Sequence, residues 1–328
     1  MKPLLVVVGA WFLGIGTVLV LHPEQARSVD GPTLGGTQFW TDRLIHGDWR
    51  IQQNAVTGHF RLLDDHNVRQ ASGTYSQCRA EFLRLKAERE LPALKSTAVV
   101  TLHGLGGWRG LMQPLADYIA EQGNWTPINF TYASTRKTVE DHAQSLALVI
   151  DNLTDVEQVH FVAHSLGNVV VRRYLDLHAK DPAAERRGAK IGRVVMIGPP
   201  NNGSSVARLL ESNKLFEWIG GSSAQQLGTA WDELKPRLAT PQDFGIIAGS
   251  TFGGAGGNPL VEGDDDLFVG VEETKLPGAA DFLTVPSTHT LLLAKREVRE
   301  ATLRFLEHGY FISADARKPL GNDAVAAE

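Results

Sequence analysis

Between Ser96 and His308 the sequence alternates short, continuous apolar runs with longer segments of helical periodicity. Continuous apolar runs are typical of strands that are buried on both faces of a parallel sheet. Strands that alternate with helices predict βαβ units, and therefore an α/β fold with a mostly parallel sheet and helices on both faces. The predicted strands span 98–102, 126–130, 159–163, 193–197, 244–248 and 282–285, and the predicted helices span 111–122, 139–153, 167–178, 205–218 and 291–308.

Three of these predicted strands are followed by residues with catalytic potential. Open α/β sheets bind their ligands at the carboxyl ends of the strands, so these residues are the ones to inspect. One run leads into His103 to Gly107, another into His164 to Gly167, and the last into Pro286 to His289. The sequence therefore places a glycine-rich turn, a serine and a histidine at one edge of the predicted sheet.

Ser165 lies in Ala163-His164-Ser165-Leu166-Gly167, which differs from Gly-x-Ser-x-Gly only at Ala163. A nucleophilic serine needs a tight strand-to-helix turn, and small residues two positions before and after it let the backbone close. The motif falls between a predicted strand and a predicted helix, as that mechanism requires. We expect Ser165 to be a nucleophile, while an ordinary serine in a turn remains the alternative because so short a motif arises by chance.

The turn from His103 to Gly107 is a candidate oxyanion hole. The backbone N–H groups of Leu105 and Leu166 are the two donors that we expect to bind the oxyanion of the substrate. A plain turn and a dinucleotide phosphate cradle are the alternatives. The cradle is disfavoured because Trp108 and Arg109 leave Gly-x-Gly-x-x-Gly incomplete.

With these two turns the sequence resembles the α/β-hydrolase superfamily, and within it the lipase and esterase group with an Ala-His-Ser-x-Gly elbow and a His-Gly-x-Gly oxyanion turn. The resemblance covers roughly residues 96–308. Gly198 to Ser204 is similar to the Gly-Thr-Pro-Asn/His-x-Gly-Ser turn of that group, with Pro199 in place of Thr. Asp264 to Val271 looks like its Asp-Gly-x-Val acid loop, with Leu267 in place of the usual Gly.

The resemblance implies a catalytic acid in this loop. We expect Asp266, because it keeps the spacing to the two valines that follow, with Asp265 and Asp264 as alternatives. A solvated acidic loop or a weak Ca²⁺ site would also contain clustered carboxylates. The chain order of the fold is Ser, Asp or Glu, then His, which makes His289 the expected base. His103 is expected to brace the oxyanion turn.

These residues predict a serine hydrolase that cleaves carboxylic esters of apolar or lipid-like acyl groups through an acyl-enzyme on Ser165. The mechanism needs no metal and no organic cofactor. A thioesterase or amidase with the same triad, and a catalytically inactive binding module, are the alternative functions. Residues 199–240 are interpreted as a lid over the acyl pocket or as an ordinary crossover; their apolar residues are Leu209, Leu210, Leu215, Phe216, Trp218 and Ile219.

The segment from Pro3 to Leu21 carries no charge and is almost wholly apolar. As a helix it would measure roughly 28 Å, which is close to the thickness of the bilayer core. The preceding Lys2 favours an N-terminus in the cytoplasm and a hydrolase domain outside it. We expect residues 1–22 to be an uncleaved membrane anchor; a cleaved signal peptide, which would make the protein secreted, and a buried helix are the alternatives.

We expect residues 23–95 to be a linker and N-terminal extension, 96–310 the hydrolase domain and 311–328 a flexible tail. Within the extension, 23–45 reads as loop, 49–56 and 59–64 as a hairpin, and 75–91 as a helix. The net charge of -5, without a long basic run, argues against nucleic-acid binding. The single cysteine, Cys78, excludes an intrachain disulfide and a cysteine-based metal cluster. The expected ligand is a small ester or lipid; the oligomeric state stays open.

Overall fold

The computed structural model describes residues 36–182, 189–210, 214–251, 257–258 and 261–321. Residues Thr37–Glu328 form one structural unit and Met1–Gly36 another. The apolar segment from Pro3 to Leu21 lies outside the described residues, so the membrane anchor remains a prediction. In the part of the chain that is described, no helix combines the length and the apolar character needed to span a bilayer.

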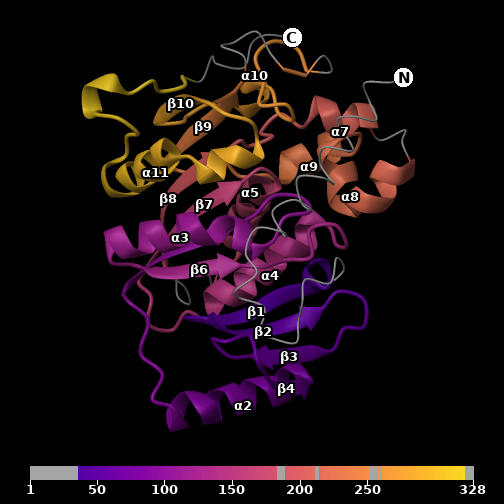
Figure 1. Cartoon of the computed structure of the whole chain (residues 1–328), viewed down its shortest axis with the longest axis vertical. Coiled ribbons are helices and arrows are strands. Elements are labelled where there is room, and N and C mark those ends of the chain that lie inside the picture. The colour runs from indigo at the N-terminus through magenta and orange to yellow at the C-terminus, as the bar shows by residue number, and fades with distance from the viewer. Residues whose placement is uncertain (1–35, 183–188, 211–213, 252–256, 259–260, 322–328) are drawn as a thin grey trace, which may run out of the picture. The chain divides into compact units, whose positions relative to one another are not determined.

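Six parallel strands form the central sheet of the second unit, in the order β10-β9-β8-β7-β5-β6 (Figure 1). Each strand contains one of the predicted apolar runs, and every neighbouring pair is parallel. The expected α/β class with a parallel sheet is therefore confirmed. The strands are β5 (Thr97–Leu102), β6 (Thr126–Phe130), β7 (Gln158–His164), β8 (Lys190–Ile197), β9 (Phe244–Ser250) and β10 (Asp281–Pro286).

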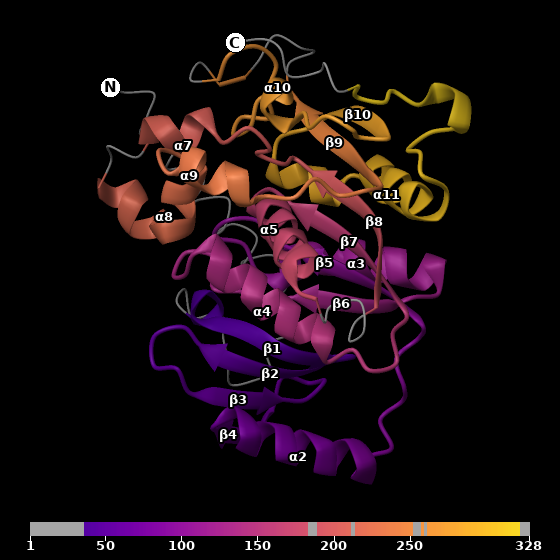
Figure 2. The ribbon, with the colours of Figure 1, turned by 180° about the vertical axis from the view of Figure 1, so that it is seen from behind.

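Helices cover both faces of this sheet. Helices α3 (Arg109–Gly123) and α11 (Arg296–His308) lie on the face seen in Figure 1, and α4 (Val139–Asp151) and α5 (Leu166–Lys180) lie on the face seen in Figure 2. Successive residues of one strand serve opposite faces, because side chains alternate along a strand. In β5, Val99 packs with the cluster of α3 and α11, whereas Val100 packs with the cluster of α4 and α5. Burial on both faces explains the continuous apolar runs.

Local sequence explains where two of the helices begin. Thr138 precedes α4, and its hydroxyl accepts from the Asp141 N–H while the Asp141 carboxylate accepts from the Thr138 N–H. Thr74 and Gln77 form the same reciprocal pair before α2 (Tyr75–Glu88). Such capping boxes satisfy N–H groups that the helix itself cannot. The predicted helix 291–308 differs: it is divided into η5 (Thr290–Ala294) and α11, with extended backbone at the residue between them.

A group of short helices lies between β8 and β9, where the lid was expected. It comprises α7 (Ser205–Leu210), α8 (Lys214–Leu227), α9 (Trp231–Leu234) and η3 (Lys235–Arg237). The side chains named for the lid, Leu209, Leu210, Leu215, Phe216, Trp218 and Ile219, lie outside the described residues. The lid therefore remains a prediction.

The N-terminal extension contains a four-stranded antiparallel sheet, β1-β2-β3-β4, covered by α2. Strands β2 and β3 form a hairpin across Thr57 and Gly58. The apolar residues Leu44, Trp49, Ile51, Leu62 and Phe82 build its core. The strands are β1 (Trp40–His46), β2 (Trp49–Asn54), β3 (Phe60–Leu63) and β4 (Arg69–Gly73).

Strand β1 corrects the expectation that 23–45 is a loop, because residues 40–45 belong to it. The pattern was misleading because Asp42 is fully buried in the strand. Its carboxylate accepts from Gln52 Nε2 at 2.8 Å and from the Thr131 N–H at 2.7 Å, while its own N–H donates to Thr131 O. A buried carboxylate is tolerated where donors surround it, and these donors come from other elements. They also join β1 to the chain that follows β6.

The chain after α11 also differs from the expected flexible tail, because residues 311–321 are hydrogen-bonded to the fold, although most of their side chains are exposed. The Asp281 carboxylate accepts from the N–H groups of Phe311 and Lys318. Leu320 exchanges backbone hydrogen bonds with Gly278 and Ala279. Residues 322–328 lie outside the described residues.

Candidate active site

Ser165 joins β7 to α5 in a strained turn. Its φ of 53° and ψ of -125° are those of the first central residue of a type II′ turn, a position that glycine normally occupies. The turn is held by the Ser165 N–H, which donates to Ile197 O at 2.9 Å, and by the Asn168 N–H and side-chain amide, which donate to Ser165 O. Backbone strain of this kind is found where a structure aims a functional side chain. Ser165 itself is partly exposed.

The oxyanion turn, residues 103–107, lies directly against this serine. A Cβ built on Gly104 would lie 2.9 Å from Ser165 Cβ, so only glycine allows the approach. The Gly107 N–H donates to Gly104 O, and Gly106 has a φ of +67°, which together define a type II turn. The predicted oxyanion turn is therefore next to the predicted nucleophile.

The direction of the Leu105 N–H follows from how Gly104 is held. Gly104 O accepts from the Gly107 N–H at 3.1 Å and from His103 Nδ1 at 2.8 Å. Because the peptide is planar and trans, the Leu105 N–H must point the opposite way. Leu166 is the first residue of α5, and the N–H groups in the first turn of a helix have no acceptor within that helix. Neither N–H has an acceptor among the described residues.

His103 braces the turn, as the sequence indicated. Burial lowers the pKa of His103 to about 4, so the ring is neutral at physiological pH. A carbonyl oxygen only accepts, so the hydrogen bond to Gly104 O places the proton on Nδ1. The ring stacks on Tyr132 with centroids 4.3 Å apart, and the Tyr132 hydroxyl donates to His103 O. His103 is thus a positioning group rather than a base.

Asp266 and His289 are hydrogen-bonded to each other, with 2.6 Å between Asp266 Oδ2 and His289 Nδ1. The Asp266 side chain is fully buried, and its other oxygen accepts from the N–H groups of Phe268 and Val269. The His289 N–H also donates to Asp266 O. A carboxylate on Nδ1 fixes the tautomer in which Nε2 is free to accept a proton. Nε2 has no partner in the described part of the chain.

The two neighbouring aspartates have other partners. Asp265 accepts from the N–H groups of Gly257, Asn258 and Leu267 and so organises the loop. Asp264 accepts from the Ser250 hydroxyl. Of the three carboxylates that the sequence left open, only Asp266 contacts His289.

Leu267 occupies the position where the resemblance places glycine, and it has a φ of 83°. A left-handed conformation costs a side chain such as leucine about 1–2 kcal/mol. The hydrogen bonds of its N–H to Asp265 and of its carbonyl to the Asn258 side chain offset this strain. The loop therefore keeps the backbone that glycine favours although leucine is present.

The end of β8 connects Ser165 with His289. Ile197 O accepts from the Ser165 N–H, and a Cβ on the next residue, Gly198, would lie 3.0 Å from His289 Cε1. His164 Nε2 donates to His289 O at 3.1 Å, and burial holds the pKa of His164 well below its usual range. The expected nucleophile, base and acid thus meet at one sheet edge. No hydrogen bond joins Ser165 Oγ to His289 among the described residues.

Two cavities lie outside the group formed by Ser165, Asp266 and His289. One, of about 240 Å³, is polar and lies between the N-terminal sheet and α4, with Arg43, Asp141 and Ser145 in its lining. The other, of about 360 Å³, lies beside the acid loop and contains Leu267 and Leu291. Ser165 lines neither of them, so neither defines an acyl pocket.

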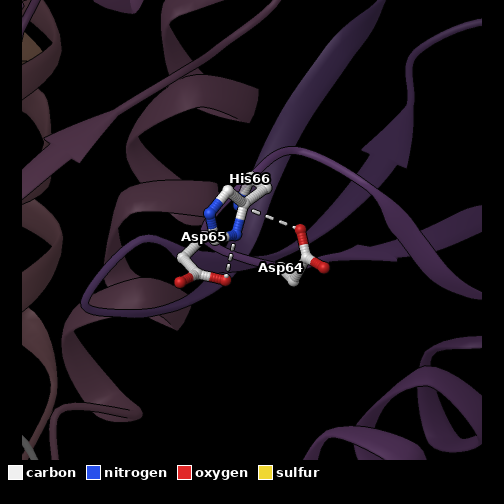
Figure 3. A group of neighbouring side chains, drawn as sticks. All are labelled: Asp64, Asp65 and His66. Atoms are coloured by element: carbon white, nitrogen blue, oxygen red, sulfur yellow. Dashed lines mark hydrogen bonds and ion pairs between the residues drawn. The ribbon is translucent and has the colours of Figure 1, made fainter. Parts of the chain in front are cut away.

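Asp64, Asp65 and His66 form a small group of possible cation ligands in the turn after β3, drawn in Figure 3. The Asp64 carboxylate is already satisfied, because it accepts from the N–H groups of His66 and Val68 and from the Gln70 side chain. Asp65 and His66 are exposed, with 3.1 Å between Asp65 Oδ1 and His66 Nδ1. Asp64 therefore shapes the turn between β3 and β4.

The sequence matches no protein-family model and no curated protein. Solved structures that resemble part of the chain include a lipase of Bacillus licheniformis in its propeptide form, with 18% identity over 70% of this chain and 52% of that one, at a TM-score of 0.49. A Legionella pneumophila phospholipase in complex with thio-NAD has 18% identity over 55% and 44%, at a TM-score of 0.42. A metagenomic carboxyl esterase has 17% identity over 60% and 65%, at 0.41.

The aligned part spans about half the length of the lipase and less than half of the phospholipase.

Proposed function

We propose that this protein is a serine hydrolase of the α/β-hydrolase type that cleaves carboxylic esters. The observation that carries the proposal is the buried Asp266–His289 hydrogen bond beside the strained turn of Ser165. Nucleophilic catalysis by serine requires such a base, oriented by a carboxylate, next to the hydroxyl. The N–H groups of Leu105 and Leu166, which have no acceptor among the described residues, add the donors that a developing oxyanion needs.

In the proposed mechanism Ser165 Oγ attacks the ester carbonyl while its proton passes to His289 Nε2. Asp266 stabilises the imidazolium, and the Leu105 and Leu166 N–H groups bind the oxyanion of the tetrahedral intermediate. The intermediate collapses to an acyl-enzyme as His289 protonates the departing alcohol. Water, activated by His289, then releases the acid. These reaction steps require neither a metal nor an organic cofactor.

The substrate class is tested with a series of p-nitrophenyl esters from acetate to laurate. We expect hydrolysis of the series, with kcat/KM rising towards longer acyl chains, because each buried methylene contributes about 0.8 kcal/mol. Matched thioesters and anilides separate the thioesterase and amidase alternatives. A purified, folded protein that hydrolyses none of these compounds would contradict the proposal and favour the binding module.

We also propose that residues 1–22 hold the enzyme at a membrane with the hydrolase domain outside the cytoplasm. The support is the uncharged stretch from Pro3 to Leu21, whose length as a helix matches the bilayer core. After carbonate extraction we expect the full chain in the membrane pellet and a chain lacking residues 1–22 in the supernatant. Recovery of the full chain in the supernatant would overturn the anchor.

A further inference from the structure

We propose that Gln38 is a positioning residue that holds the oxyanion turn in its working conformation. This inference rests on the proposed function. Gln38 lies in η2 (Thr37–Phe39), far outside the part of the sequence that resembles hydrolases. Its side chain nevertheless reaches the turn: Nε2 donates to Gly107 O at 2.6 Å.

A second contact links Gln38 to the turn through Ser134, which is fully buried. The Ser134 hydroxyl donates to Gln38 Oε1 at 3.1 Å, and its oxygen accepts from the Gly106 N–H at 3.0 Å. The Thr135 hydroxyl donates to the same Gln38 oxygen. One glutamine amide therefore holds two peptides of the turn, the peptide between Gly107 and Trp108 directly and the peptide between Leu105 and Gly106 through a serine.

The turn needs such a brace because its own sequence does not fix its conformation. The peptide between Leu105 and Gly106 is the central one of the Gly104–Gly107 turn, and its flip interconverts types I and II. Glycine accepts either sign of φ, so Gly106 does not prevent the flip. The observed form, with Gly106 at a φ of +67°, is the one in which its N–H meets Ser134. Gln38 and Ser134 thus select the type II form.

The consequence for catalysis concerns the neighbouring Leu105 N–H. A flip rotates the peptide between Leu105 and Gly106 and breaks the hydrogen bond from the Gly106 N–H to Ser134, so the turn loses a contact that holds it in place directly after Leu105. A turn without this contact holds the Leu105 N–H less rigidly towards the oxyanion. Oxyanion donors act because they are preorganised, so this loss falls on the transition state more than on substrate binding.

Hydrogen bonds from the N-terminal sheet hold Gln38 and its partners Ser134 and Thr135 in place. Next to Gln38 in the chain, Thr41 Oγ1 accepts from the Ala133 N–H, and Asp42 exchanges two hydrogen bonds with Thr131. The loop of residues 131–135 is thereby fixed to β1. The N-terminal sheet, through this loop, belongs to the structure that shapes the active site.

The first test compares Gln38→Ala with Gln144→Ala, an exposed glutamine on α4 that serves as the matched control. We expect Gln38→Ala to lower kcat about tenfold with KM within twofold of wild type, and Gln144→Ala to change neither. Ser134→Ala should reproduce the kcat loss from the other side of the contact. Unchanged kcat in both Gln38→Ala and Ser134→Ala would overturn the inference.

A pH profile of Gln38→Glu separates positioning from mere stability. A protonated glutamic acid donates to Gly107 O as the amide does, whereas the ionised form has no proton to donate and repels that carbonyl. The ratio of kcat for Gln38→Glu to wild-type kcat should therefore be near one at acidic pH and fall about tenfold as the carboxyl ionises. A ratio that does not vary with pH would assign Gln38 to fold stability alone.

Amide hydrogen exchange at Gly106, followed by NMR, reports on the brace without any turnover. We expect exchange at Gly106 to be at least tenfold faster in Gln38→Ala, and exchange at Val100 in the buried strand β5 to stay unchanged. If wild type hydrolyses no ester, the proposed function fails, yet this measurement still tests the brace. Equal Gly106 exchange in wild type and Gln38→Ala would show that Gln38 does not hold the turn.

Discussion

Ser165→Ala is expected to lower kcat for ester hydrolysis by a factor on the order of 10⁵, because it removes the atom that forms the acyl-enzyme. Labelling by a fluorophosphonate probe should disappear with it. The variant should fold, since alanine keeps the size of the side chain, and no hydrogen bond of the serine hydroxyl is present among the described residues to be lost. Ser76→Ala, an exposed serine on α2, is the matched control and should be labelled like wild type.

Ser165→Gly adds a measurement of the strain in the turn. It should be as inactive as Ser165→Ala but about 1 kcal/mol more stable, because glycine adopts a φ of 53° without the steric cost. Urea unfolding of the two variants gives this difference. Persistent labelling of either variant would move the nucleophile to another residue and contradict the proposed mechanism.

Asp266→Asn is expected to lower kcat by about 10⁴ while leaving the fold intact. An asparagine amide at this position can donate to His289 Nδ1, which favours the tautomer with the proton on Nε2, where it cannot act as a base. The hydrogen bonds from Phe268 and Val269 can persist to the asparagine oxygen. The measurement is kcat at neutral pH together with the thermal unfolding midpoint.

The neighbouring aspartates are the matched controls for this prediction. Asp264→Asn should change kcat by no more than a few-fold, because an amide oxygen still accepts from the Ser250 hydroxyl. Asp265→Asn should instead lose about 1–3 kcal/mol of stability, because both Asp265 oxygens accept from backbone N–H groups and the asparagine NH2 group would replace one of these acceptors with a donor. Equal, mild losses of kcat in Asp264→Asn and Asp266→Asn would show that Asp266 is not the acid.

The central sheet could be predicted because its signal is local. Each strand is a run of apolar residues set by burial on both faces, and each helix has its own period, so neither requires knowledge of distant contacts. The turns at the strand ends could be found for the same reason, since a serine or histidine that follows a buried strand must lie at the sheet edge.

Strand β1 and the chain after α11 were missed because long-range hydrogen bonds decide them. From the sequence alone Asp42 is typical of a loop, and only the structure shows that Gln52 and Thr131 donate to its carboxylate. From the sequence alone residues 311–321 are typical of a polar tail, and only the structure shows that the N–H groups of Phe311 and Lys318 donate to Asp281. In both segments the deciding hydrogen bonds come from residues that are remote in sequence.

By itself, the sequence determined an α/β fold and the order in which a serine, an acidic loop and a histidine reach one edge of a parallel sheet. It could do so because each buried strand is visible as a short apolar run, and because the order of these runs and of the residues after them is given by the chain itself. The tertiary structure alone decided that Asp266, not its neighbours, binds His289, and that Gln38 holds the turn beside Ser165. Contacts of this kind depend on the directions of side chains from separate elements, which are set only when those elements pack.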